Sequence, residues 1–279
     1  MPYVSVKGVD LHYRVDGPAG ADNAVGAPVV DAAAATASGA PWLVLSNSLG
    51  SDLSMWTAQL AAFATHYRVL RYDTRGHGHS AAPAGSYTIE QLTGDVIGLL
   101  DELHIERAHF CGISMGGLTG VALAARYPDR VNRVVLSNTA AKIGSDEVWG
   151  PRADRARNEG MAALAGAVLP RWFTADFIER EPLMFAQIRD VFVHTHGEGY
   201  ASNCDALRVA DLRGETHNIL APALVITGTH DLAATPAQGQ ELAESIRGAR
   251  YLELDASHIS NLERVGEFNG AVLDFLGQA

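Results

Sequence analysis

The sequence predicts an α/β protein with a mostly parallel β-sheet, helices on both faces of the sheet and a helical cap inserted between two of its strands. Short, almost continuously apolar runs alternate with stretches of helical periodicity, as expected of parallel strands that are buried on both faces. This alternation stops between residues 142 and 218, where only helical periodicity is present, and then resumes. An interruption of this kind indicates an insertion into an α/β core.

The individual elements follow from local patterns. Residues 3–7 and 11–15 alternate apolar and polar side chains around Gly8, which is typical of an antiparallel hairpin at a sheet edge. Buried strands are then expected at residues 42–46, 67–73, 108–114, 133–138, 223–228 and 249–255. Helices are expected near residues 55–64, 89–103, 115–127, 236–246 and 262–276.

These elements divide the chain into three parts. We expect the first part of the α/β core over residues 1–141, the helical cap over 142–218 and the second part of the core over 219–279. Residues 17–40 consist mainly of Gly, Ala, Pro, Asp and Ser, with few large apolar side chains. Such a segment buries too little surface to offset its ordering entropy, so we expect a long flexible surface loop there.

Composition limits the partners and the compartment. A chain of 279 residues that is 47% hydrophobic can bury a full core, and its net charge of -11 argues against nucleic acid as a partner. Cys111 and Cys204 are too few for a disulfide scaffold and are expected to be buried free thiols. Charged residues between Lys7 and Arg14 interrupt any signal-peptide core, and no segment is long and apolar enough to span a membrane. We therefore expect a cytoplasmic protein without membrane contact, whose oligomeric state stays open.

The strongest chemical motif is Gly112-Ile113-Ser114-Met115-Gly116-Gly117, between an expected strand and an expected helix. It fits the G-x-S-x-G pattern in the strand-turn-helix context that this pattern requires. The sharp turn leaves little room beside the serine, so glycines flank it and the hydroxyl is exposed at the helix N-terminus. Ser114 is therefore the predicted nucleophile.

A serine nucleophile needs a histidine base that a carboxylate orients. Downstream of Ser114, Asp231 follows the strand expected at 223–228 and His258 follows the strand expected at 249–255. Both lie at carboxyl ends of strands, where an open parallel sheet places its ligand site. We predict Asp231 as the acid and His258 as the base. Asp255 is the competing acid, but it lies in the same turn as His258 and is badly placed to reach the imidazole edge.

A tetrahedral intermediate also needs two backbone N–H donors. The residue after the nucleophile, Met115, supplies one, and the loop after the strand expected at 42–46 supplies the other, with Leu49 in the best register. The H-x-H pairs His77 and His79, and His194 and His196, lack the further ligands of a metal site, so no metal is expected.

Five segments of the chain resemble bacterial 3-oxoadipate enol-lactonases of the α/β-hydrolase superfamily. They are SNSLGSDLSMW (46–56), YDTRGHGHS (72–80), FCGISMGGLTG (110–120), LSNTAAKIG (136–144) and ASHISNLE (256–263). The second segment occurs in many α/β-hydrolases, and its Asp73 and Arg75 are expected to shape a loop. The resemblance implies opening of 3-oxoadipate enol-lactone to 3-oxoadipate in aromatic catabolism, with an acyl-enzyme on Ser114 and without metal or organic cofactor.

The substrate that this resemblance implies is a small lactone that also carries a carboxylate, so the cap should offer hydrogen-bond donors. Trp149 is the first candidate because its indole could combine ring contact with an N–H donor. The others are Lys142, Arg152 and Arg171.

Two other functions stay open. A carboxylesterase or a carbon-carbon bond hydrolase would use the same serine, histidine and aspartate on another small acyl substrate. A non-catalytic ligand receptor on a hydrolase scaffold would typically have lost one of these three residues, and all three are present here.

Overall fold

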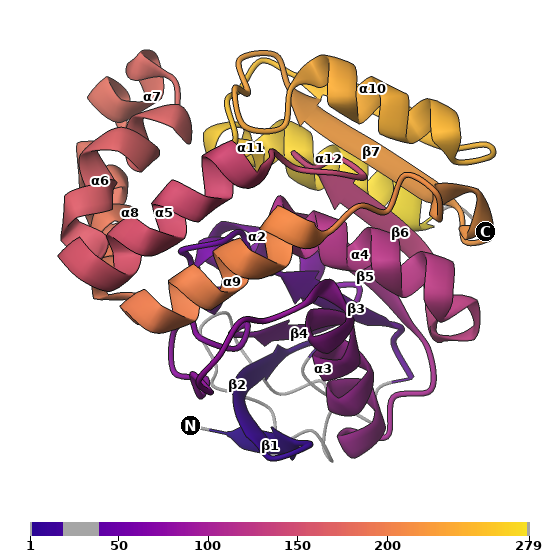
Figure 1. The fold of residues 1–279 in the computed structure, drawn as a ribbon. Helices are drawn as coiled ribbons and strands as arrows, with labels where there is room; N and C mark the ends of the chain where they lie inside the picture. Colours follow the sequence, from indigo (N-terminus) through magenta and orange to yellow (C-terminus); the bar gives the residue numbers. More distant parts are fainter. Residues whose placement is uncertain (1, 19–38, 278–279) are drawn as a thin grey trace.

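The computed structural model describes residues 2–18 and 39–277, which form an eight-stranded sheet with helices around it (Figure 1). The order in the sheet is β1-β2-β4-β3-β5-β6-β7-β8. The pairs β1–β2 and β2–β4 are antiparallel, and all pairs from β4 to β8 in this order are parallel. The strands are β1 (Tyr3–Val6), β2 (Val9–Asp16), β3 (Trp42–Ser46), β4 (Arg68–Tyr72), β5 (Ala108–Ile113), β6 (Val131–Ser137), β7 (Ala223–Gly228) and β8 (Arg250–Leu254). The predicted mostly parallel sheet and its N-terminal hairpin are confirmed.

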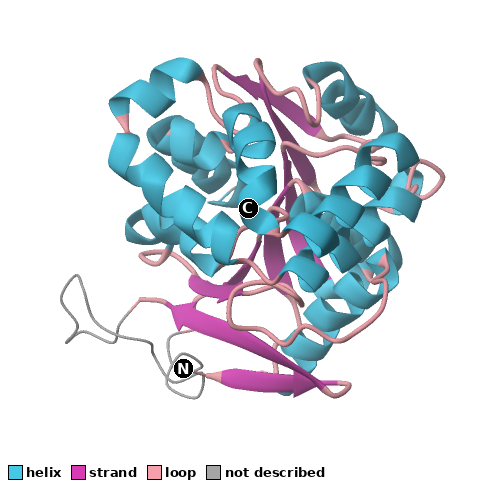
Figure 2. Cartoon of the chain, turned by 60° about the vertical axis from the view of Figure 1, so that its left-hand side comes forward, coloured by secondary structure: helices cyan, strands magenta, loops and turns pink. Residues whose placement is uncertain are grey.

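Helices cover both faces of the sheet, which lies between them in Figure 2. The helices α2 (Thr57–Phe63), α11 (Ser260–Glu263) and α12 (Val265–Gly277) pack together on one face. The other face carries α3 (Ile89–Glu102), α4 (Met115–Arg126) and α10 (Pro236–Ser245). Because the central strands have helices on both sides, every residue of β3, β5 and β7 is buried, as their apolar sequences require.

The prediction of a single closing helix over residues 262–276 is wrong in detail, because the backbone leaves the helical conformation at Arg264 and two helices result. The Glu263 carboxylate accepts the backbone N–H groups of Ser257 and Thr174, at 2.6 and 2.9 Å. The Arg264 side chain donates to the backbone oxygen of Asp255 at 2.6 Å. These bonds tie the chain to the loop after β8 and separate α11 from α12.

Between β6 and β7 the described chain is helical, as expected. Its longer helices are α5 (Asp146–Glu159), α6 (Met161–Val168), α7 (Ala175–Arg180), α8 (Pro182–His194) and α9 (Gly197–Val209). They form a layer at one end of the sheet, with α5 packed along α9 (Figure 1). The division of the chain at residues 141/142 and 218/219 stays a prediction, and most of the loop expected at 17–40 lies outside the described residues.

The core is continuous from the sheet into the cap. Trp56, Phe110 and Phe268 are among its fully buried side chains, and each such burial contributes about 1.5–3 kcal/mol. Cys111 and Cys204 are both buried free thiols, as predicted, and burial raises the pKa of each. Across residues 2–18 and 39–277, the helices are all too short or too polar to cross a bilayer.

The loop after β4 is held by buried hydrogen bonds to Asp73 and by a buried ion pair between Arg75 and Asp95. Asp73 accepts hydrogen bonds from the ring of His12 at 2.7 Å and from the backbone N–H of Leu53 at 2.8 Å. The guanidinium of Arg75 donates two hydrogen bonds to Asp95 in α3, at 2.6 and 2.5 Å. Burial raises the pKa of Asp95, although Arg75 opposes this effect. Asp73 and Arg75 thus shape this loop.

Asp95→Ala should therefore destabilise the protein by about 3–5 kcal/mol, because it leaves the buried Arg75 guanidinium without its carboxylate. The matched control is Asp101→Ala on the same helix, whose exposed carboxylate pairs with Arg130 and should contribute at most about 1 kcal/mol. Urea denaturation of both variants measures the difference. Equal losses would contradict the assignment of the Arg75–Asp95 pair as a structural contact.

Candidate active site

Ser114 lies in the sharp turn between β5 and α4, with φ +56° and ψ −115°. This conformation is strained for a residue with a side chain, so the surroundings must hold it. The Ser114 N–H donates to the backbone oxygen of Ser137 at 2.9 Å, and the Gly116 N–H donates to that of Asn47 at 3.0 Å. The ends of β6 and β3 thus fix the turn from both sides.

The glycines of the motif are required by close approach. A Cβ atom on Gly112 would lie 2.2 Å from the backbone oxygen of Gly116, and one on Gly116 would lie 2.3 Å from that of Ser46. A Cβ atom on Gly117 would lie 2.6 Å from the side chain of Thr139. The spacing of glycines in the sequence therefore reflects how tightly α4 packs against β3 and β6.

Asp231 and His258 form a buried pair at the ends of β7 and β8. The imidazole Nδ1 lies 2.8 Å from the Asp231 carboxylate, and both side chains are almost completely buried. A carboxylate accepts only, so Nδ1 carries the proton and Nε2 is left free to act as a base.

The Asp231 carboxylate is stabilised in its ionised form. Its other oxygen accepts the backbone N–H groups of Ala233 and Ala234 at 2.7 and 3.0 Å. Burial alone would raise the pKa of Asp231, but the adjacent His258 and these two N–H groups outweigh it and hold the pKa below its usual value. The residue can therefore orient His258 and stabilise a positive charge on it.

Asp255, the competing acid of the sequence analysis, has other partners. Its exposed carboxylate lies 2.9 Å from the Nε2 atom of His230 and 2.5 Å from the guanidinium of Arg264. His258 is bonded to Asp231 instead.

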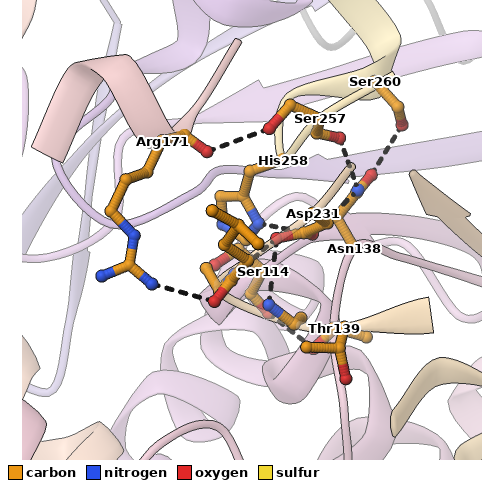
Figure 3. A network of polar contacts seen from close by, with 12 residues as sticks. Ser114, Asn138, Thr139, Arg171, Asp231, Ser257, His258 and Ser260 are labelled. Carbon is orange, nitrogen blue, oxygen red and sulfur yellow. Dashed lines mark hydrogen bonds and ion pairs between the residues drawn. The ribbon is translucent and has the colours of Figure 1, made fainter. Parts of the chain in front are cut away.

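Asn138 joins this network, although the sequence analysis did not single it out. Its amide donates to Asp231 and to the backbone oxygen of Ser257, both at 3.1 Å, and its oxygen accepts the hydroxyl of Ser260 at 2.6 Å (Figure 3). Asn138 follows β6 directly and has φ +46°, which asparagine tolerates better than most residues. A polar residue directly after a buried strand, on the edge that carries the motif, is the signal that could have identified it.

Ser114 and His258 line the same cavity, of about 240 Å³, between the sheet and the cap. The cap and the loops around it contribute Ile143, Trp149, Arg152, Arg171, Trp172 and Tyr200, among others. None of the described lining residues is acidic, although the whole chain carries a net charge of -11. The cavity is thus suited to a small anionic molecule.

The two predicted N–H donors are placed beside the turn. Met115 is the first residue of α4, and the first N–H groups of a helix have no acceptor within the helix. Leu49 lines the cavity in the loop after β3. Its neighbours are already bonded, since the Ser48 N–H donates to the sulfur of Met55 and the Gly50 N–H to His77.

The four candidate substrate-binding residues separate into two groups. Trp149, Arg152 and Arg171 line the cavity, but the Trp149 indole N–H already donates to the backbone oxygen of Ile143 at 2.6 Å. Arg171 donates to the backbone oxygen of Leu232 at 2.9 Å, and the Arg152 guanidinium lies 5.2 Å from the centroid of the Trp149 ring. Lys142 lines a neighbouring hollow and lies 3.5 Å from the Asp211 carboxylate.

The fold and this arrangement of side chains define an α/β hydrolase. Consistent with this, residues 41–265 match the family described as alpha/beta hydrolase fold. Two related sequences and one solved structure show which family of α/β hydrolases the chain belongs to.

The chain is 49% identical to 3-oxoadipate enol-lactonase 2 of Acinetobacter baylyi over 83% of this chain and 87% of the relative. It is 39% identical to 3-oxoadipate enol-lactonase 1 of the same organism, over 82% and 86%. The crystal structure of the enol-lactonase from Burkholderia xenovorans LB400 superposes with a TM-score of 0.92 at 66% identity, covering 99% of this chain and all of that one. The chain therefore belongs to the 3-oxoadipate enol-lactonase family of α/β hydrolases, and the resemblance seen in the sequence is confirmed.

Asp231→Asn should lower kcat by about 10^4, because the amide cannot hold His258 in the tautomer with a free Nε2 atom. The matched change Asp255→Asn should leave kcat unaltered, because that carboxylate contacts His230 and Arg264 on the surface. Steady-state kinetics of both variants on the lactone give the comparison. A severe loss in Asp255→Asn with a mild one in Asp231→Asn would exchange the two roles.

Proposed function

We propose that the chain hydrolyses 3-oxoadipate enol-lactone to 3-oxoadipate, a step of the β-ketoadipate pathway, with Ser114, His258 and Asp231 as its catalytic residues. The observation that carries the proposal is that His258, bonded to the buried Asp231, lines the same cavity as Ser114 in a member of the enol-lactonase family. The cytoplasmic location expected from the sequence is part of this proposal.

The first half of the reaction forms an acyl-enzyme. His258 Nε2 takes the proton of the Ser114 hydroxyl as its oxygen attacks the lactone carbonyl. Negative charge develops on the carbonyl oxygen, where the N–H groups of Leu49 and Met115 stabilise it. Asp231 stabilises the positive charge that His258 acquires at this stage.

Collapse of the tetrahedral intermediate breaks the ring carbon-oxygen bond. The leaving group is an enolate oxygen, which takes the proton from His258. The enol formed in this way then tautomerises to the ketone. Because the enol is consumed in this way, the ring does not readily close again. Water then attacks the acyl-enzyme with His258 as the base, which frees Ser114 and gives the second carboxylate of the product.

The substrate carboxylate is proposed to bind Arg152, with Arg171 at the rim of the cavity. Arg152 is half-buried in α5 and stacks near Trp149, and among the described residues no carboxylate forms an ion pair with it. Trp149 contributes its ring surface, since its N–H donates to Ile143. A guanidinium in a cavity without acidic residues offers a charge-assisted hydrogen bond to the carboxylate.

Ser114→Ala should lower turnover of the lactone by roughly 10^4 to 10^6 while the fold is retained. Loss of the ultraviolet absorbance of the enol-lactone measures the reaction, and circular dichroism checks the fold. Retention of more than about a tenth of the wild-type rate would remove Ser114 as the nucleophile. A simple aryl acetate run in parallel separates the alternatives: cleavage of the ester alone would favour a carboxylesterase, and no reaction with either would favour a receptor.

Arg152→Met should raise KM for the lactone by about 10- to 100-fold, the value of a lost charge-assisted hydrogen bond, and leave the neutral aryl acetate unaffected. Methionine keeps an apolar stem over Trp149 but removes the charge. Lys142→Met is the matched control, because Lys142 lies outside the cavity and should leave both substrates unaffected. A KM increase only in the Lys142 variant would transfer carboxylate binding to that residue.

A further inference from the structure

We propose that His77 is a positioning residue. Its neutral imidazole accepts a hydrogen bond from the loop that carries the Leu49 donor, and so holds that donor in place in the oxyanion hole. The inference rests on the proposed function, in which Leu49 stabilises the developing oxyanion. The observation behind it is a buried hydrogen bond from the Gly50 backbone N–H to His77 Nε2, at 2.8 Å.

The direction of this bond fixes the tautomer of His77. A backbone N–H can only donate, so Nε2 must carry no proton and the ring proton lies on Nδ1. Nδ1 faces the backbone oxygen of Arg75 at 3.4 Å. Only 1% of the residue is exposed, and burial lowers the pKa of His77 to about 4, which keeps the acceptor available at neutral pH.

The loop around Leu49 depends on this acceptor. On one side of Leu49, the Ser48 N–H donates to the sulfur of Met55 at 3.4 Å, a weak bond. On the other side, Gly50 adopts φ +82° and is bonded to His77. The stronger anchor of the Leu49 segment is therefore the bond to His77.

Two aromatic side chains of the cap also pack against Gly50. A Cβ atom on Gly50 would lie 2.9 Å from the ring of Phe192 and 3.0 Å from that of Tyr200, so the glycine is enclosed between His77 and two cap aromatics. An acceptor that moves away from this N–H leaves a buried polar group unpaired, which would shift the peptide.

His77 is itself clamped by the cap. The amide of Asn203 in α9 donates to the backbone oxygens of Arg75 and Gly199, both at 2.8 Å. Gly76 and Gly199 meet so closely that a Cβ atom on Gly76 would lie 2.6 Å from the Gly199 Cα atom. Docking of α9 thus sets the position of the His77 ring, and the ring sets the position of the loop.

Loss of the His77 acceptor should weaken stabilisation of the transition state and therefore lower kcat. Loss of one oxyanion donor costs about 10^2–10^3 in kcat, and a displacement of this donor should cost part of that. His77→Phe keeps a ring of similar size but has no acceptor for the Gly50 N–H. We expect kcat for the lactone to fall by about 10- to 100-fold, with KM changed by less than about three-fold.

Two further variants separate positioning from bulk structure. In His77→Gln the side-chain oxygen can replace Nε2 as acceptor, so kcat should recover to within about five-fold of wild type. His79→Phe changes an exposed histidine of the same loop and should leave kcat and KM unaltered. A boronate that mimics the tetrahedral intermediate should bind His77→Phe more weakly by the same factor as kcat/KM falls.

Long-range proton–nitrogen NMR on the wild-type protein tests the geometry without any variant. It should show His77 protonated on Nδ1 with a bare Nε2 atom at neutral pH. A proton on Nε2 would overturn the proposal, as would a His77→Phe variant with wild-type kcat. If wild type does not open the lactone, the proposed function fails instead, and the NMR result still decides whether His77 accepts the Gly50 N–H.

Discussion

The strained turn at Ser114 is the constraint on which the rest of the site depends. Its conformation is held because Ser137 accepts the Ser114 N–H and Asn47 accepts the Gly116 N–H. The Thr139 hydroxyl also donates to the backbone oxygen of Ser114 at 2.8 Å. These partners lie at the ends of β3 and β6, the two neighbours of β5, because Ser137 is the last residue of β6 while Asn47 and Thr139 come just after β3 and β6. Since parallel strands end at the same edge of a sheet, the contacts that hold the turn also bring the loops of the site together.

A buried carboxylate is costly unless its oxygens are hydrogen-bonded, and Asp231 satisfies this condition without an arginine or lysine. It receives two backbone N–H groups, the imidazole of His258 and the amide of Asn138. Asn138 in turn accepts hydroxyl groups from Ser137 and Ser260. The Asp231 carboxylate is thus fixed by groups from three different loops, and this explains why its pair with His258 is geometrically defined in the absence of a ligand.

Local charge and overall charge differ in this protein. The chain as a whole is acidic, yet the lining of the cavity that contains Ser114 and His258 carries Arg152 and Arg171 and, among its described residues, no carboxylate. Charges at the surface are screened over about 10 Å, whereas a guanidinium in a partly enclosed cavity acts on a bound ligand at close range. A small anionic lactone can therefore be accommodated in this cavity although the net charge of the whole chain is negative.

Local patterns in the amino-acid sequence are enough to predict the strands, the mostly parallel sheet and the strand ends that carry Ser114, Asp231 and His258, because periodicity and turn chemistry are local properties. The break between α11 and α12 is not predicted in this way, because it depends on contacts of Glu263 and Arg264 with other loops. The hydrogen-bond partners of the residues at the strand ends depend on the packing of distant segments: His258 bonds to Asp231, whereas Asp255 faces His230 and Arg264. Tertiary packing also places Lys142 outside the cavity, pairs the Trp149 N–H with Ile143, and brings Asn138 to Asp231 and His77 to Gly50. Hydrogen-bond partners depend on the approach of residues that are far apart in the chain, and only the packing of cap, loops and sheet defines that approach.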